Sequence, residues 1–333
     1  MQREALNGGK RLAVAGCKHT TLDLVRALRR TGYRIDHCLT LTPEQKERHQ
    51  VSGYMDLRPH LEGMGIPYTI APTYGLNTPE DRRALEPIVI DLMAVVGWQR
   101  LIPAWLLERI PLGAYGMHGS SRPLPHGRGR SPMNWSIITG RDRFYTHLIR
   151  YTPGVDEGPI VGQVMFQITP EDTALTCHKK NQVAMVRLLC EHLPALLRGE
   201  AKPTPQPSQG ASYWPKRSPE DGLIDWAGSA EAICRLVRGT AWPFPGAFSF
   251  LDDDPAHKVI LWRAQPFDAW LTYPQAAPGE IVEVFFDGTW VARCRDASVL
   301  VTESEEHSFT EEDLGRRLGC AGMPIKQWTG LPD

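Results

Sequence analysis

The sequence feature that most limits the fold is an alternation of short apolar runs with amphipathic helical patterns in the N-terminal third. Arg11 to Gly16 (RLAVAG) is an apolar run closed by glycine, and Thr21 to Thr31 then places apolar residues at helical spacing before a glycine that can end a helix. Strands that alternate with helices form parallel βαβ units, so this part predicts a parallel sheet covered on both faces. Further strands are predicted within 34–40, 66–70 and 85–97.

The pattern changes after a proline-rich stretch. Ala201 to Asp221 holds five prolines and no hydrophobic period, which is typical of a linker or an irregular crossing segment. A helix is predicted over Ser229 to Arg238, with Ser229 as its N-cap, and alternating strand patterns follow it. Two of them flank Asp287-Gly288, a hairpin signal. We therefore expect domains at 1–204 and 219–325, joined by a linker at 205–218, with an antiparallel β domain in second place.

The charge balance limits the class of partner. Lys and Arg total 37 and Asp and Glu total 38, so the formal net charge is −1. The chain has no overall positive field to attract a polyanion, and nucleic acid is not expected as a partner.

Cysteines and apolar runs bear on the compartment. The seven cysteines are scattered without a CxxC pair, which argues against a disulfide framework and a structural zinc site, and we expect no metal. The first residues carry no signal-peptide core, and no apolar run approaches the roughly 20 residues that span a bilayer. We expect a cytoplasmic protein without membrane contact.

The turn after the first apolar run excludes two common nucleotide sites. Gly16-Cys17-Lys18-His19-Thr20 lacks two of the three glycines of the dinucleotide fingerprint, and the chain has no Walker A loop. Neither NAD nor a P-loop nucleotide is expected.

Two turn-rich loops carry the residues best suited to chemistry. His118 follows a predicted strand at 113–117 and opens a loop rich in Gly, Ser and Pro, and Asp156 lies in a second loop, Gly154 to Pro159. Open α/β sheets bind ligands in loops at the carboxyl ends of their strands. On the residues alone, His118 is either a catalytic or a structural loop histidine.

These loops resemble the folate-dependent N-formyltransferase family, whose core reads N-x-H-G-S-L-L-P-x-x-R-G-x-x-P and later G-x-D-x-G-P-I. This chain has His118-Gly119-Ser120 and Gly154-x-Asp156-x-Gly158-Pro159-Ile160 at matching spacing. The piece RGRSPMNW (128–135) resembles formyltransferases of nucleotide-linked amino sugars, such as the 4-amino-4-deoxyarabinose type. SPEDGLIDW (218–226) and WPFPGAF (242–248) are similar to a C-terminal domain shared with methionyl-tRNA formyltransferase.

The resemblance implies a fold, a reaction and a set of site residues. It implies a Rossmann-like first domain, an OB-like barrel as the second, and transfer of a formyl group from N10-formyltetrahydrofolate to a primary amine. A neutral imidazole can take a proton or donate a hydrogen bond, and a carboxylate beside it fixes its tautomer. The implied catalytic residues are His118 and Asp156, with Ser120 and Asn134 as further candidates. The implied folate-binding residues are Gln99, Arg100, Leu101, Ile102, Gly154, Val155 and Asp156, and acceptor-binding roles fall on Arg122, Arg128, Arg130 and Trp135.

Two departures from the family bear on the reaction. The family has Asn two residues before the histidine, where this chain has Gly116, so the donor to the formyl oxygen is open: Ser120, Asn134 or a backbone N–H could replace it. Alternatively the reaction is slow, or the chain binds folate or a nucleotide without turnover. Ser121 to Pro123 also takes the space of one family residue, beside His118.

The acceptor is predicted to be a small molecule, and a nucleotide-linked amino sugar is the leading prediction. Methionyl-tRNA is disfavoured by the charge of −1 and by the acidic run Asp252 to Asp254. A small amine of the hydroxyornithine type is an alternative, and a homodimer is possible.

Overall fold

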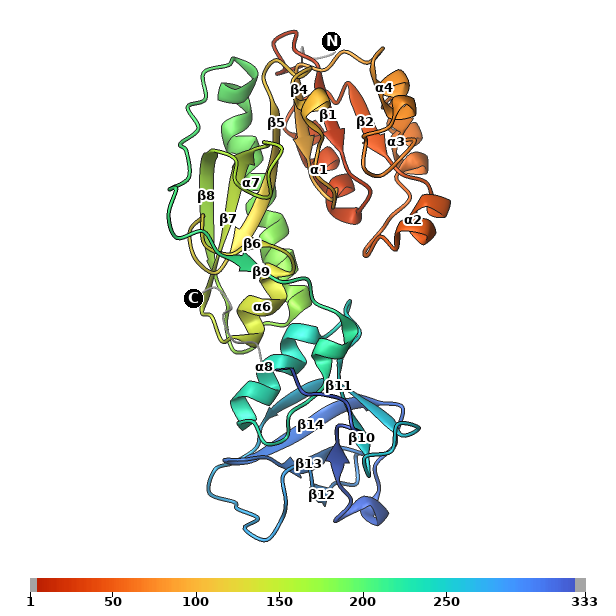
Figure 1. Cartoon of the computed structure of the whole chain (residues 1–333), viewed down its shortest axis with the longest axis vertical. Coiled ribbons are helices and arrows are strands. Elements are labelled where there is room, and N and C mark those ends of the chain that lie inside the picture. Colours follow the sequence, from red (N-terminus) through yellow and green to blue (C-terminus); the bar gives the residue numbers. More distant parts are fainter. Residues whose placement is uncertain (1–4, 327–333) are drawn as a thin grey trace.

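A seven-stranded sheet of order β3-β2-β1-β4-β5-β7-β8 forms the first lobe of the computed structural model, which describes residues 5–326 (Figure 1). Strands β1 to β5 run parallel, and β7 and β8 run antiparallel to their neighbours. The strands are β1 (Leu12–Ala15), β2 (His37–Thr40), β3 (Tyr68–Ile70), β4 (Leu92–Val95), β5 (Ala114–Ser120), β7 (Arg143–Arg150) and β8 (Ile160–Gln167).

Helices cover both faces of this sheet because its parallel strands are apolar on both sides. Leu12 and Val14 of β1 pack with helices α1 (His19–Arg30) and α7 (Ala174–Leu197), whereas Ala13 and Ala15 pack with α4 (Pro79–Leu85) and α5 (Ala104–Leu107). The remaining helices of this lobe are α2 (Pro43–His49), α3 (Arg58–Gly63) and α6 (Pro132–Ile138). The predicted α/β domain with a mostly parallel sheet is confirmed.

The second lobe is an antiparallel sheet with one leading helix, α8 (Ala230–Thr240). The sheet has six strands in the order β12-β13-β14-β11-β10-β15, and its core includes Trp226, Trp290 and Ile233. This confirms the predicted smaller β domain. Its strands are β10 (Ala247–Leu251), β11 (Lys258–Pro266), β12 (Ile281–Val284), β13 (Trp290–Arg293), β14 (Ser298–Glu305) and β15 (Leu318–Gly319), with 3-10 turns at Pro219–Gly222 and Glu311–Asp313.

The segment between the lobes runs along the first lobe. Strand β9 (Tyr213–Trp214) pairs with β6 (Arg128–Gly129), the strand that follows the loop opened by His118. Thr204 also forms a bridge with Ile160. The segment 205–218, predicted to be a linker, is thus ordered against the first lobe.

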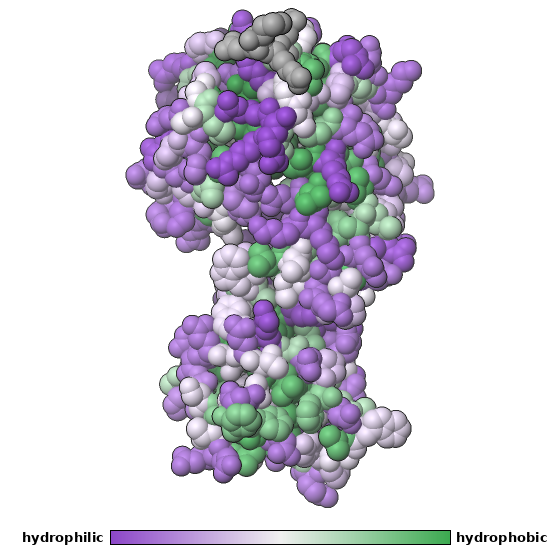
Figure 2. Space-filling view, turned by 180° about the vertical axis from the view of Figure 1, so that it is seen from behind, coloured by the Kyte–Doolittle hydropathy of each residue, from purple (hydrophilic) through white to green (hydrophobic). Residues whose placement is uncertain are grey.

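Helices α6 and α8 join the two lobes at a narrow waist, seen from behind in Figure 2. Gly239 allows the close approach, because a Cβ there would lie 2.7 Å from the side chain of Ile138. Figure 2 also shows hydrophilic residues over most of the larger lobe and more hydrophobic residues on the smaller one. In the described part of the chain, no helix is both long and apolar enough to cross a membrane.

Candidate active site

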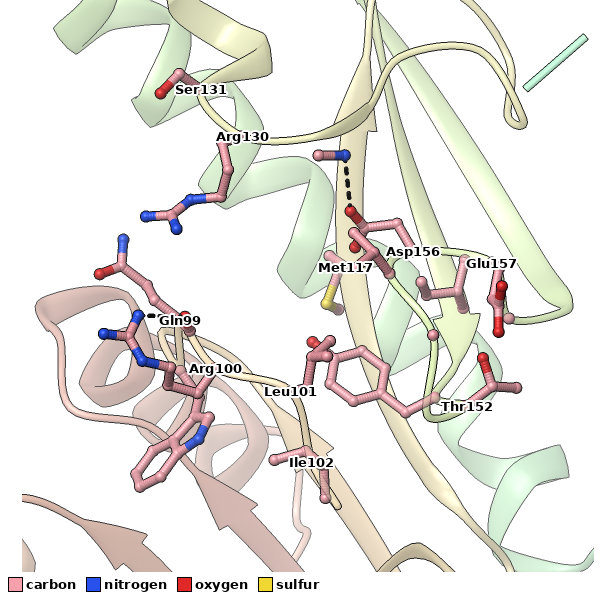
Figure 3. A pocket seen from close by; sticks show the side chains of 17 residues that line it. Gln99, Arg100, Leu101, Ile102, Met117, Arg130, Ser131, Thr152, Asp156 and Glu157 are labelled. Carbon is pink, nitrogen blue, oxygen red and sulfur yellow. Dashed lines mark hydrogen bonds between the residues drawn. The ribbon is translucent and has the colours of Figure 1, made fainter. Parts of the chain in front are cut away.

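The side chains of His118 and Asp156 lie next to each other near the carboxyl end of β5, a central strand of the first sheet. His118 lies on β5, and Asp156 lies in the loop between β7 and β8, where its φ of 51° places it in the left-handed region. Nδ1 of His118 is 3.2 Å from Oδ2 of Asp156. The same oxygen accepts a hydrogen bond of 3.0 Å from the backbone N–H of Gly129 (Figure 3). Two donors from different segments therefore fix the carboxylate.

The other nitrogen of His118 also faces an acceptor. Nε2 lies 2.8 Å from the carbonyl oxygen of Gly127, and the side chain is 8 % exposed. A doubly protonated ring donates to both Asp156 and Gly127, whereas a singly protonated ring satisfies one of them. Both ring nitrogens of His118 therefore face an acceptor oxygen.

A second histidine, His147, lies on the neighbouring strand β7 and contacts the residues around His118. His147 on β7 stands opposite His118, is fully buried, and accepts a 3.3 Å hydrogen bond from the backbone N–H of Leu124 at Nε2. Its Nδ1 faces the carbonyl oxygen of His118. Burial, and to a lesser degree the neighbouring His118, lower the pKa of His147 to about 4. Neutral His147 therefore holds the 121–127 loop in place.

A cavity of about 460 Å³ opens beside Asp156. One wall is the segment after β4 and the other is the loop between β7 and β8, and Figure 3 shows side chains from both converging on the space between them. All seven residues predicted to bind folate line it: Gln99, Arg100, Leu101, Ile102, Gly154, Val155 and Asp156. Leu101 and Val155 are 51 % and 43 % exposed there.

Arg128 braces the Asp156 loop through Gln206. Its guanidinium donates to Oε1 of Gln206 at 2.7 Å and 3.1 Å and to the hydroxyl of Tyr213. The Gln206 amide in turn donates to the carbonyl oxygens of Asp156 and Gly158. Arg128, predicted to bind the acceptor, is thus engaged within the chain and supports the loop.

Three other predicted residues lie in the interior and do not line the cavity. Asn134 Nδ2 donates to the carbonyl oxygen of Gly239 at 2.8 Å, and Trp135 is fully buried with Nε1 donating to Pro215. Ser120 is 1 % exposed and lies against Gly127. Asn134, a candidate donor to the formyl oxygen, thus braces α6 against the Gly239 carbonyl.

Arg122 and Arg130, both predicted to bind the acceptor, line different cavities. Arg130 lines the main cavity, above Gln99 and Arg100 in Figure 3. Arg122 lines a different, more open cavity of about 490 Å³ together with Arg141 and Arg143. Their acceptor-binding roles remain predictions.

Sequence reasoning missed Lys18 and Gln206, whereas Tyr151 begins the segment 151–156 that the family resemblance implies for the folate pocket. Lys18 precedes α1, and burial lowers the pKa of its ammonium to about 8, with the charge of Arg130 contributing in the same direction. Its position after the first apolar run was a usable signal, because ligands bind where strand order reverses, here between β1 and β4. Tyr151 follows β7 and lines the cavity. Gln206 carried no local signal.

Family models match both lobes. One described as "Formyl transferase" matches residues 60–193, and one described as "Formyl transferase, C-terminal domain" matches residues 216–310, together about two thirds of the chain.

Solved structures share this fold at low identity. HypX from Aquifex aeolicus in complex with tetrahydrofolic acid is 19 % identical with a TM-score of 0.62, covering 88 % of this chain and 44 % of its own. The chain thus spans less than half of HypX. An N-formyltransferase from Helicobacter canadensis in complex with folinic acid and dTDP-3-aminofucose is 14 % identical with a TM-score of 0.64, covering 89 % and 100 %. WlaRD, a sugar 3N-formyl transferase, is 14 % identical with a TM-score of 0.63, covering 88 % and 97 %.

Proposed function

The chain belongs to the folate-dependent formyltransferase family, and we propose that it transfers a formyl group from N10-formyltetrahydrofolate to the primary amine of a nucleotide-linked amino sugar. The observation that carries the proposal is the meeting of the His118–Asp156 pair with the cavity that all seven predicted folate-binding residues line.

The cavity fits a folate. Its volume of about 460 Å³ is within the usual range for small-molecule sites, about 300–1,000 Å³. Leu101 and Val155 turn exposed apolar surface toward it, which a flat aromatic ring system would cover. HypX and the Helicobacter canadensis enzyme were each solved with a folate, which supports the same donor here.

His118 and Asp156 supply the acid–base chemistry of the proposed reaction. The attacking amine must lose a proton and N10 of the folate must gain one, and an imidazole performs such transfers near neutral pH. Asp156 holds Nδ1 and stabilises the imidazolium, which leaves Nε2 for the substrate. The contact between Nε2 and the Gly127 carbonyl is therefore exchanged for the substrate during turnover.

Two cations make the same region suitable for a phosphorylated acceptor. Arg130 lines the cavity, and Lys18 lies close enough to Arg130 for the two charges to interact. A guanidinium and an ammonium together suit a diphosphate. WlaRD was solved with dTDP, and the Helicobacter canadensis enzyme with dTDP-3-aminofucose, which favours a nucleotide-linked amino sugar over methionyl-tRNA or hydroxyornithine.

A second candidate function is binding of folate or a nucleotide without turnover. Gly116 stands where the family has Asn, and Nε2 of His118 is satisfied by the Gly127 carbonyl. Both observations favour a chain that holds the ligands but transfers slowly or not at all.

The deciding experiment is a transfer assay followed by mass spectrometry. The purified chain is incubated with N10-formyltetrahydrofolate and, separately, a dTDP-linked 3-amino sugar, a dTDP-linked 4-amino sugar, N-hydroxyornithine and methionyl-tRNA. We expect a gain of one formyl group on an amino sugar. Folate binding without any formylated product would support the second candidate.

The His118→Ala variant tests the catalytic assignment in the same assay. We expect a rate loss of at least about 100-fold, because proton transfer by a positioned side chain contributes about 100- to 10,000-fold. Unchanged formylation by His118→Ala would remove His118 from the mechanism.

A further inference from the structure

The proposed reaction needs a donor that several candidate residues do not supply. When an amine attacks the formyl carbon, negative charge develops on the formyl oxygen, and a fixed hydrogen-bond donor stabilises it. Asn134 already donates to Gly239, and Ser120 lies against Gly127 in the interior. His118 is needed for proton transfer. The donor must therefore come from elsewhere on the cavity wall.

Tyr151 brings a hydroxyl to the required place. It directly follows β7, and its backbone N–H donates to the carbonyl oxygen of Ala114 at 2.8 Å, which anchors it beside β5. Its phenol end lies over Gly116, two residues before His118. A Cβ at Gly116 would stand 2.5 Å from the Tyr151 hydroxyl oxygen and 2.7 Å from two ring carbons. A side chain at residue 116 would overlap the phenol of Tyr151, so this position accommodates only glycine.

The hydroxyl matches the reach of an asparagine amide. Bond lengths of about 1.5 and 1.3 Å put an asparagine amide nitrogen about 2.4 Å from its own Cβ. The Tyr151 oxygen lies 2.5 Å from the Cβ position of residue 116. The Tyr151 hydroxyl therefore lies at the same distance from the Cβ position of residue 116 as the amide nitrogen of an asparagine at that residue would.

This hydroxyl is available and stays protonated. Within residues 5–326 no group accepts a hydrogen bond from it, and Tyr151 lines the cavity with Asp156. Burial raises the pKa of the phenol, and the negative charge of Asp156 raises it further. The O–H therefore stays protonated at neutral pH.

We propose that the Tyr151 hydroxyl donates the hydrogen bond that stabilises the formyl oxygen during transfer, a role that rests on the proposed function. The amine lone pair forms the new C–N bond while the carbonyl π electrons move to the oxygen, which the Tyr151 O–H stabilises without giving up its proton. The carbonyl then re-forms, the bond from carbon to N10 breaks, and one proton passes from the amine to N10. Tyr151 ends the cycle unchanged.

Tyr151→Phe is the first test, because it removes the hydroxyl and keeps the ring on Gly116. We expect kcat to fall about 100- to 1,000-fold while KM for the folate changes little. Tyr115→Phe is the matched control: this buried tyrosine on β5 donates to Leu112 and packs with α1 and α7, so its loss leaves kcat unchanged. A wild-type kcat in Tyr151→Phe overturns the proposal.

Double variants distinguish a role of Tyr151 as a hydrogen-bond donor from a purely structural role of its ring. Tyr151→Ala opens the space above residue 116, and adding Gly116→Asn returns an amide donor to it. We expect this double variant to be about tenfold or more faster than Tyr151→Ala alone. Gly116→Leu in the same background has the shape of Asn without the donor and gives no recovery. Equal recovery by Leu and Asn overturns the proposal.

A binding measurement keeps this proposal distinct from the proposed function. The wild type should bind 10-formyl-5,8-dideazafolate about tenfold more tightly than its unformylated parent, and Tyr151→Phe should lose that preference. If the wild type transfers no formyl group but the preference depends on Tyr151, the proposed function fails and Tyr151 is still the donor. If the preference survives in Tyr151→Phe, the Tyr151 proposal fails whatever the transfer assay shows.

Discussion

Gln206, from the segment between the lobes, donates its side-chain amide to the backbone carbonyl oxygen of Asp156 at 2.7 Å. The same amide donates to Gly158, and its oxygen accepts from Arg128. A residue 50 positions away in sequence therefore holds the loop that carries Asp156.

Gln206→Glu tests this support. The carboxylate still accepts from Arg128 but cannot donate to the two carbonyl oxygens, so the Asp156 loop loses both restraints. We expect kcat to fall about 10- to 100-fold, because small displacements of a positioning group are costly, with KM for the acceptor little changed. The exposed Gln265→Glu serves as control, and a wild-type kcat for Gln206→Glu would show that the loop holds its own shape.

Asp156→Asn removes the negative partner of His118 and keeps the side-chain size. The imidazolium loses its stabilising charge, so we expect kcat to fall at least about 100-fold with folate binding retained. Asp254→Asn is a matched control, because Asp254 lies at the same 3.2 Å from a histidine, His257, on the surface. Steady-state kinetics and folate titration measure both effects, and retention of kcat in Asp156→Asn would contradict the assigned role.

Leu101→Asp places a charge on the exposed apolar wall of the cavity. Burying that charge against a folate is costly, so we expect folate Kd to rise at least about tenfold. Leu271→Asp changes an equally exposed leucine of the second lobe, at 61 % exposure, and should leave Kd unchanged. Equal Kd values for the two variants would place the folate outside this cavity.

Arg130→Met removes the guanidinium assigned to the acceptor phosphates. A charge-assisted hydrogen bond contributes about 1.5–3 kcal/mol, so KM for a nucleotide-linked acceptor should rise about 10- to 100-fold, with folate Kd unchanged. Arg29→Met, on the exposed end of α1, is the control. An unchanged acceptor KM for Arg130→Met, together with a raised one for Arg122→Met, would move the acceptor to the second cavity.

His147 makes stability depend on pH. Its pKa is about 4 in the folded protein against about 6.5 unfolded, so the unfolded chain binds more protons between these values. The free energy of unfolding should therefore be highest above pH 6.5 and fall by about 3 kcal/mol toward pH 4 through this group. Urea unfolding of His147→Gln should show a shallower dependence, and His257→Gln the wild-type one.

The parts of the fold that the sequence predicted are those encoded locally. Each of β1, α1 and β2 has its own apolar pattern and its own ending glycine or polar turn. Strands β1 and β2 lie within the predicted ranges, and α1 begins two residues before its predicted range. Strands β7 and β8 and helix α7 were not predicted. The antiparallel pairing of β7 with β5 places His147 opposite His118, and β8 pairs with the other side of β7.

The site residues also divide into those that the local sequence indicates and those that tertiary packing brings together. His118, Asp156 and the cavity residues lie in or next to loops whose spacing is visible in the sequence, and the structure brings them together. Asn134 reaches a carbonyl 105 residues away, and Tyr151 reaches Gly116 only through the register of β5 with β7. Contacts of that kind depend on tertiary packing and leave no local pattern.

The pairing of β9 with β6 sets where the chain can be cut. A fragment ending at residue 204 would carry the whole seven-stranded sheet and both His118 and Asp156. It would lack Gln206, the Ser212 hydroxyl that accepts from the Gly127 N–H, and the Tyr213 hydroxyl that accepts from Arg128. The shortest N-terminal fragment that keeps these contacts therefore ends beyond Trp214. Any exchange of the second lobe would have to retain the segment from Gln206 to Trp214.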